Sequence, residues 1–257
     1  MGLMTTRFFI KMGYLGTGYA GWQIQPGSPT IQWELDQALS LILRCEIHST
    51  GAGRTDTGVH ARCFYAHADL PLDQRALDTD QLTYKLNRLL PYGIAIHNVI
   101  PVNAGAHARF DAISRTYHYY ISTTKDPFTH GRAWLMTRPL DMAAMNKAAG
   151  ILMEYDDFGC FSKSNTQVNN TRCNIMSAVW QFEEKQLVFK ITANRFLRNM
   201  VRAITGTMVD VGLGKISPEK FRMIIESGDR RKAGYSAPAC GLYLWDINYP
   251  LLDETQS

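Results

Sequence analysis

The sequence predicts an α+β protein made of two ferredoxin-like (RRM-like) β-α-β-β-α-β modules, with mainly antiparallel sheets flanked by helices. Short runs rich in β-branched and aromatic residues alternate with segments whose apolar residues recur at helical spacing. This order of elements occurs twice along 257 residues, a length that allows one large domain or two of ordinary size.

The first module is predicted to begin with a strand at 7–15 and to end with one at 94–100. Between them, Thr30 is placed to cap a helix that runs from Ile31 to about Arg44, because apolar residues recur there at helical spacing. The remaining elements are a short strand at 46–50, a strand at 62–69 and a helix at 80–90 that ends before Pro91.

The second module repeats this order. Its strands are expected at 115–123, 174–183, 186–193 and 242–248, and its helices at 141–153, 195–211 and 218–227. Residues 101–110, which contain a proline and a glycine, are the expected crossing between the halves. The predicted domains are therefore residues 1–104 and 105–257.

Composition narrows the class of protein. Hydrophobic residues make up 46% and charged residues 19%, as in soluble globular proteins, and no apolar run approaches the ~18 residues of a membrane span. The five cysteines form no C-x-x-C pair, and the seven histidines form no H-E-x-x-H spacing. We therefore expect reduced thiols in a cytoplasmic protein, with no metal, disulfide framework or membrane partner. The net charge of +4 is compatible with a polyanionic partner.

Residues 51–61 form a predicted loop that carries an acid near a base and contains three glycines. Glycines at this density suit a backbone that turns sharply or lets a ligand approach closely. Asp56 follows Arg54 by two residues and can be a carboxylate held ionised, as a nucleophile or general base requires. For an arbitrary aspartate, the ordinary interpretation is an Asx-turn with a surface ion pair.

The segment Gly16-Thr-Gly-Tyr-Ala-Gly21 satisfies the G-x-G-x-x-G spacing of a dinucleotide-binding motif. In that motif a helix must begin at the glycines, so that its N-terminal amides meet the pyrophosphate. Here the next helix is expected only near Thr30, after two prolines. We therefore predict a tight loop that presents Tyr19 and Trp22, and no nucleotide site.

Three arginines mark the helix predicted at 195–211. Arg195, Arg198 and Arg202 follow i, i+3, i+7 spacing, which puts three guanidinium groups on one stripe. Because the macrodipole favours anions near a helix N-terminus, phosphates or a buried carboxylate are expected opposite these cations. The ordinary alternative is a solvated basic face.

The strand that begins near residue 115 is rich in tyrosine. Alternation puts Tyr117 and Tyr119 on one face, with His118 and Tyr120 on the other. Aromatic rings on a sheet can stack bases, although strands also favour aromatic residues in the core. Together with Asp56 and the arginines, this strand indicates an RNA-acting protein with one catalytic aspartate.

Through nearly its whole length the chain resembles the tRNA pseudouridine synthases of the TruA family. The matching blocks, in the family's order and spacing, are residues 16–23, 51–61, 107–110, 114–117, 199–202 and 237–244. The resemblance implies isomerisation of uridine to pseudouridine at positions 38, 39 and 40 of the tRNA anticodon stem-loop. It also implies a homodimer that binds tRNA and needs no cofactor.

Carried over residue by residue, the resemblance makes Asp56 the catalytic aspartate, which attacks C6 of the base or C1′ of the ribose. Arg202 matches the arginine that pairs with this aspartate, and Tyr117 matches the tyrosine that stacks on the uracil and serves in proton transfer. Arg54 matches the arginine that helps to expose the flipped base, and Leu242 matches an apolar residue of the pocket. The other residues expected to bind RNA are His107, Arg109, Arg195, Arg198 and the run Arg230-Arg231-Lys232.

Some positions depart from the family pattern. Leu15 stands where many members have Asp, Thr57 where Ala is common, and Cys63-Phe64-Tyr65 in a segment where many carry Gly-Gln-Val. These changes bear on the range of modified positions rather than on activity. The alternatives are a relative that modifies other tRNA positions or other RNAs, an RNA-binding chaperone with a vestigial site, and a retaining nucleoside hydrolase that releases free uracil.

Overall fold

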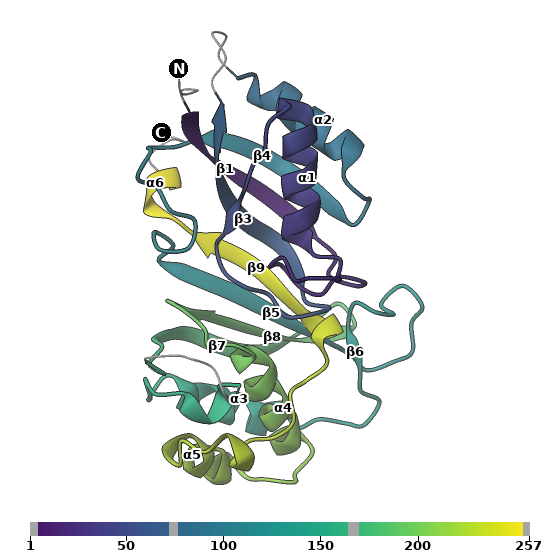
Figure 1. Ribbon diagram of the computed structural model, residues 1–257. Coiled ribbons are helices and arrows are strands. Elements are labelled where there is room, and N and C mark those ends of the chain that lie inside the picture. The colour runs from purple at the N-terminus through teal and green to yellow at the C-terminus, as the bar shows by residue number, and fades with distance from the viewer. Residues whose placement is uncertain (1–4, 72–76, 164–169, 254–257) are drawn as a thin grey trace. The chain divides into compact units, whose positions relative to one another are not determined.

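The computed structural model describes residues 5–71, 77–163 and 170–253 (Figure 1). Two compact units divide the chain: one holds the residues up to Ile113 together with those from Leu244 on, and the other holds Ser114–Tyr243. Each unit combines a mostly antiparallel sheet with helices, in agreement with the predicted α+β class. The predicted domain boundary after residue 104 stays a prediction.

The first unit is built on a sheet whose central strand, β1, pairs antiparallel with β3 on one side and β4 on the other. Its strands are β1 (Thr5–Tyr14), β2 (Thr50–Gly51), β3 (His60–Pro71), β4 (Ile94–Pro101) and the end of β9 (Leu242–Asn248). Its helices are α1 (Ile31–Leu43), α2 (Thr79–Leu89) and the short α6 (Pro250–Asp253). Helices α1 and α2 lie on the same face of this sheet (Figure 1).

Helix α1 has the predicted apolar spacing and begins directly after Thr30, as predicted. Ile31, Leu35 and Leu39 are fully buried, so the i, i+4, i+8 stripe faces the core. Thr30 is the N-cap residue, as predicted, but its side chain makes no capping hydrogen bond. Instead the carbonyls of Gly21 and Trp22 accept from the first two helical amides, at 3.2 and 3.0 Å. Backbone carbonyls of the loop before the helix therefore satisfy amides that a capping side chain would otherwise bind.

The second unit contains three antiparallel strands in the order β5-β8-β7, with β6 parallel to β5. These strands are β5 (Ser114–Ser122), β6 (Trp134–Leu135), β7 (Ile175–Glu183) and β8 (Gln186–Ala193). The helices are α3 (Met142–Leu152), α4 (Met200–Gly212) and α5 (Pro218–Glu226), with single 3₁₀ turns at Gly159–Phe161, Arg230–Lys232 and Ala239–Gly241. Asp141 and Ser217 cap α3 and α5 through their side chains.

The sequence predicts that this helix begins at residue 195, but α4 begins at Met200. Asn199 has a φ of 66°, a left-handed conformation that a right-handed helix cannot continue through and that asparagine tolerates. The first helical hydrogen bond runs from the Ala203 amide to the Asn199 carbonyl, at 3.0 Å. Arg195 and Arg198 thus precede the helix, so the predicted stripe of three guanidinium groups is wrong.

A buried carboxylate in α1 makes the stability of the first unit depend on pH. Asp36 is only 4% exposed, and its Oδ1 accepts from the Ser49 amide and hydroxyl at 3.0 and 2.5 Å. Its Oδ2 is buried and has no hydrogen-bond partner in the described part of the chain. Burial raises the pKa of Asp36 to about 6, against the hydrogen bonds from Ser49, which lower it.

We expect Asp36→Asn to stabilise the protein at pH 8 by about 2–3 kcal/mol, and not at pH 4. The folded state holds this proton more tightly than the unfolded chain, whose carboxyl titrates near its ordinary value. The contribution of Asp36 is therefore fully present below that value and is lost as the pH rises through about 6. Urea unfolding at both pH values measures the difference. Glu46→Gln, at an exposed carboxylate, is the control, and an equal response of the two variants would contradict the assignment.

A helix that spans a bilayer needs a long apolar run, and none of the helices in residues 5–71, 77–163 and 170–253 has one.

Candidate active site

The Asp56 loop lies between β2 and β3 and is anchored on both sides of the aspartate. The Tyr14 and Thr55 hydroxyls are 2.9 Å apart, and the Thr55 carbonyl accepts from the Trp22 amide at 3.4 Å. The Val59 amide donates to the Asp56 carbonyl at 3.1 Å, which closes a turn. Asp56 itself is half-buried, whereas Arg54 is exposed. The loop thus holds a carboxylate at the surface on a fixed backbone.

The glycine-rich segment at 16–21 supports this loop. Gly21 has a φ of 97°, and a Cβ at this position would lie 2.2 Å from the Thr55 carbonyl oxygen, so only glycine lets the two backbones approach. The Gly58 amide also donates to the Tyr19 carbonyl, at 3.3 Å. Trp22 is 3% exposed and its ring centroid lies 4.2 Å from that of Phe64. The prediction that the segment presents Trp22 is therefore wrong.

In the second unit, Arg202 occupies the first turn of α4, where the macrodipole disfavours a cation. Its Nε donates to the carbonyl oxygen of Ala237 at 2.7 Å, and its own carbonyl accepts from the Ala237 amide at 2.9 Å. Ala237 is fully buried. These two bonds fix the direction in which the guanidinium group leaves the helix.

The segment that carries Ala237, the 233–237 loop, is in turn held by Arg230. The Arg230 guanidinium donates to the Gly234 carbonyl at 3.0 Å and to the Ser236 hydroxyl at 3.1 Å. Asn199 also donates to the Ser236 hydroxyl, at 2.6 Å. Arg230 therefore supports the loop that positions Arg202, a role that the run of three cations did not indicate. Arg231 is exposed and pairs with Asp229 at 2.8 Å.

Gly206 lets the 233–237 loop lie directly on α4. A Cβ at this position would lie 1.9 Å from the Tyr235 carbonyl oxygen, which belongs to the backbone. We expect Gly206→Ala to lower the free energy of unfolding by about 1–3 kcal/mol and to lower activity, because the loop must move away from the helix. Denaturant unfolding measures the loss. Gly150→Ala is the control, since Gly150 in α3 has open space around it, and an equal loss in both variants would contradict the contact.

The two tyrosines predicted to share a face of β5 have different surroundings. Tyr119 is fully buried, its hydroxyl donates to the Pro238 carbonyl at 2.8 Å, and burial raises its pKa far above the usual range. Tyr117 is half-buried, and its ring meets the edge of Phe196 with centroids 5.1 Å apart. Tyr119 is thus a core residue, and Tyr117 is the one placed to meet a ligand.

The predicted site residues are divided between the two units. Arg54, Asp56, His107 and Arg109 belong to the first unit, and Tyr117, Arg195, Arg198, Arg202 and Leu242 belong to the second. Leu242 is buried at the start of β9. Arg198 is exposed in the segment before α4, where its carbonyl accepts from the Lys163 amide at 3.1 Å, and Arg195 is half-buried there.

Other nucleophilic or basic side chains are poorly suited to catalysis. Burial raises the pKa of the Cys63 and Cys173 thiols to about 11 and that of Cys160 to about 12, so each is protonated at neutral pH. Burial also lowers the pKa of His67 and His118 to about 4, which keeps both rings neutral. Asp56 has no evident rival among these groups.

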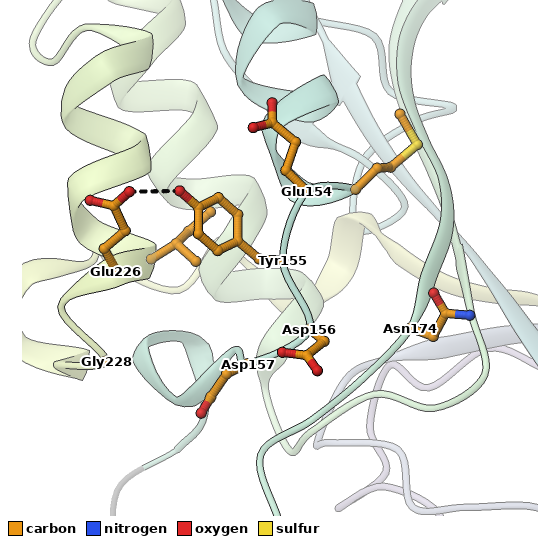
Figure 2. A pocket seen from close by; sticks show the side chains of 9 residues that line it. Glu154, Tyr155, Asp156, Asp157, Asn174, Glu226 and Gly228 are labelled. Carbon is orange, nitrogen blue, oxygen red and sulfur yellow. Dashed lines mark hydrogen bonds between the residues drawn. The ribbon is translucent and has the colours of Figure 1, made fainter.

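A pocket of about 550 Å³ lies in the second unit, and none of the predicted site residues is among the residues that line it (Figure 2). Acidic side chains dominate its wall: Glu154, Asp156, Asp157 and Glu226. Glu154 pairs with Arg222 at 2.6 and 3.0 Å, and the Tyr155 hydroxyl donates to Glu226 at 2.7 Å. These contacts tie the end of α3 to α5. No lysine or arginine is among the residues that line the pocket, so its wall offers phosphate no cation.

Known proteins resemble this chain along most of its length. A family model described as tRNA pseudouridine synthase matches residues 154–250. A tRNA pseudouridine synthase A from Porphyromonas gingivalis is 53% identical over 246 residues, covering 95% of this chain and 97% of that protein. Proteins of the same name from Bacteroides fragilis and Bacillus subtilis are 50% and 38% identical, and each comparison covers 95% of this chain and 96% or 99% of the relative.

Among solved structures, an aminoacylhistidine dipeptidase from Vibrio alginolyticus aligns with a TM-score of 0.25 and 11% identity, over 93% of this chain and 42% of that one. This likeness is too low to inform the fold or the activity. The sequence identity to the three synthases is much higher, and the aligned region includes both units because it covers 95% of the chain. The chain therefore belongs to the tRNA pseudouridine synthase A family, as its motifs predict.

Proposed function

We propose that this protein isomerises uridine to pseudouridine in tRNA, at positions 38, 39 and 40 of the anticodon stem-loop. The observation that carries the proposal is the anchored Asp56 loop, on a chain 53% identical to a tRNA pseudouridine synthase A. The reaction needs a nucleophilic carboxylate. Asp56 offers one on a backbone held by hydrogen bonds at Thr55 and at Asp56 itself.

In the proposed reaction, the Asp56 carboxylate attacks C6 of the base or C1′ of the ribose. The bond between N1 and C1′ breaks, the base rotates, and C5 bonds to C1′. The bond that the Asp56 carboxylate formed with C6 or C1′ also breaks, which returns the free carboxylate. C5 loses a proton and N1 gains one, so product and substrate contain the same atoms. The reaction consumes no co-reactant, and we propose that the enzyme needs no cofactor.

The target uridine must leave the base stack to reach Asp56. Arg54 is exposed two residues before Asp56 on the same loop, and we assign it to exposing the flipped base. We assign Tyr117 to stacking on the uracil and to proton transfer, and Leu242 to the apolar wall of the pocket. The half-buried ring of Tyr117 supports its part in this assignment.

Arg202 is assigned to pairing with Asp56, which keeps the carboxylate ionised and oriented. Its fixed exit from α4 supports this role, because a charge held in place stabilises a partner without reorganising. A guanidinium at the start of a helix is otherwise unfavourable, which argues for an anionic partner.

We assign contacts with the RNA backbone to side chains other than those that surround the flipped uridine. His107, which is half-buried, is assigned to substrate binding but not to a phosphate contact. Among the residues assigned to the backbone, Arg195 is half-buried, and the exposed ones are Arg109, Arg198, Arg231 and Lys232. Such contacts position an RNA without reading its sequence. We also propose that the enzyme is a cytoplasmic homodimer, and that each unit is a ferredoxin-like module.

Release of tritium tests the reaction. The substrate is an unmodified tRNA transcript labelled at C5 of uridine, with no cofactor added. Because C5 loses its hydrogen when it bonds to C1′, we expect one equivalent of tritium in water for each modified uridine. Tight binding of tRNA with no tritium release would contradict the proposal, and free uracil would indicate a hydrolase instead.

A further inference from the structure

The loop formed by residues 106–111 presents an aromatic ring to solvent. Phe110 is 72% exposed, although the residues on either side of it in this loop are tightly bonded. Single exposed apolar residues are common and need no explanation by themselves. What distinguishes Phe110 is the combination of a fixed backbone beneath it and a cation beside it.

The backbone of this loop is fixed by side chains from three other segments of the first unit. The Ala106 carbonyl accepts from Arg7 at 3.1 Å, and the Ala108 amide donates to Nδ1 of His67 at 3.1 Å. The Ala108 carbonyl accepts from the Tyr249 hydroxyl. Since burial lowers the pKa of His67 to about 4, its ring is neutral and can accept this hydrogen bond at physiological pH.

The loop is also closed on itself through His107. The His107 amide donates to Asp111 Oδ2 at 2.7 Å, and the Asp111 amide donates to the His107 carbonyl at 3.1 Å. Nδ1 of His107 accepts from the Arg109 amide at 3.1 Å. Phe110 therefore projects from a loop that is ordered before any ligand binds, which lowers the entropic cost of binding.

Two side chains, those of His107 and Arg109, lie against the exposed Phe110 ring. The Phe110 ring lies against His107, with centroids 4.2 Å apart, and His107 lies edge-on to His67 at 4.6 Å. The Arg109 guanidinium carbon is 5.6 Å from the centroid of the Phe110 ring. An aromatic face stacks any nucleobase, and a neighbouring guanidinium suits the phosphate attached to it.

We infer that Phe110 is a stacking site for an unpaired nucleobase of the RNA substrate, with His107 behind its ring and Arg109 at the adjoining phosphate. This inference rests on the proposed function, since it requires an RNA substrate. It adds Phe110 to the binding surface and gives His107 a supporting role. Phe128, which is 85% exposed in the second unit, has no ring or cation against it in the described part of the chain and supplies a matched comparison.

The test compares Phe110→Ala with Phe110→Tyr and Phe128→Ala. Fluorescence anisotropy with a labelled, unmodified tRNA transcript measures binding independently of activity. We expect Phe110→Ala to weaken binding, and to raise KM for tritium release, by about tenfold, the loss typical of one base–aromatic stack. Phe110→Tyr should retain near-normal binding because it keeps the ring, and Phe128→Ala should bind as the parent protein does.

Salt dependence separates the stack from the charge. Arg109→Ala should reduce the slope of log Kd against log salt by about one, whereas Phe110→Ala should leave that slope unchanged.

Equal binding by Phe110→Ala and Phe128→Ala would overturn the inference, and so would weaker self-association of Phe110→Ala in sedimentation velocity. If the parent protein releases tritium while Phe110→Ala binds tRNA normally, the stacking site fails and the proposed function stands. If the parent protein binds tRNA but releases no tritium, the proposed function fails. The comparison of tRNA binding by the variants then still shows whether Phe110 is a stacking site.

Discussion

Replacement of Asp56 by asparagine or alanine is expected to lower the rate of pseudouridine formation by about 10⁴-fold or more. Removal of a nucleophile leaves only the contributions of binding and positioning, and in enzymes with a covalent step the loss is of this order. Asp56→Asn keeps the size of the side chain and leaves in place the hydrogen bonds between Tyr14 and Thr55 and from the Val59 amide to the carbonyl of residue 56. Single-turnover tritium release from labelled tRNA measures the loss.

Binding and a neighbouring variant control this result. Both Asp56 variants should bind tRNA within a few fold of the parent protein, as measured by anisotropy, because exposed cations elsewhere supply most of the affinity. Thr57→Ala changes the exposed next residue to one common in the family and should keep nearly full activity. An Asp56→Asn protein that retained more than a tenth of the parent rate would exclude Asp56 as the nucleophile.

Replacement of Arg202 by lysine is expected to lower kcat by about 10²-fold and to leave tRNA affinity nearly unchanged. Lysine keeps the positive charge but has no Nε, so it cannot donate from that position to the Ala237 carbonyl and does not hold one direction. Loss of one fixed electrostatic contact in an active site is typically of this size. The kcat and KM values from steady-state tritium release separate the two effects.

Two adjacent arginines provide the control for positioning. Arg230→Ala should lower kcat by about tenfold, because the 233–237 loop loses the hydrogen bonds at Gly234 and Ser236 and with them the placement of Ala237. Arg231→Ala removes an exposed guanidinium that bonds only Asp229 in the described chain, and should leave kcat unchanged. If both variants lowered kcat equally, the loop would not position Arg202.

Periodicity predicted most helix and strand boundaries within a few residues. It succeeds in α1, where Ile31, Leu35 and Leu39 all face the core, because one buried face imposes helical spacing on the sequence. The strand at 46–50 is one exception, since β2 covers only Thr50–Gly51, and the start of α4 at Met200 is another. The two residues of β2 are too few to carry an alternating pattern.

Contacts between distant segments decide the features that the sequence did not predict. The segment Arg195–Asn199 contains good helix formers, yet Arg198 and Asn199 are bonded to Lys163 and Ser236, and Asn199 turns left-handed. In the same way, Trp22 is buried because the 16–21 segment folds onto a loop more than thirty residues later in the chain. No local pattern encodes either contact.

In the candidate site, too, motifs predicted the residue types, whereas contacts between distant segments were not predicted. The residue types and the Asp56 loop were recognisable from motifs, and the family assignment is confirmed by relatives that cover 95% of the chain. Arg230 was predicted to contact phosphate because it stands in a run of cations, and only the 3₁₀ turn at Arg230–Lys232 directs its guanidinium back to the 233–237 loop. The role of Phe110 was not predicted, because a single exposed ring has no sequence pattern.

We propose that Asp56 catalyses the isomerisation of tRNA uridines in the anticodon stem-loop. The most direct test of this proposal treats an unmodified tRNA transcript, with uridines at 38, 39 and 40, with the parent protein or with Asp56→Asn and maps pseudouridine by carbodiimide-dependent reverse-transcription stops. We expect new stops at these positions with the parent protein and none with the variant. Stops at other positions only, or stops that persist with Asp56→Asn, would contradict the proposal.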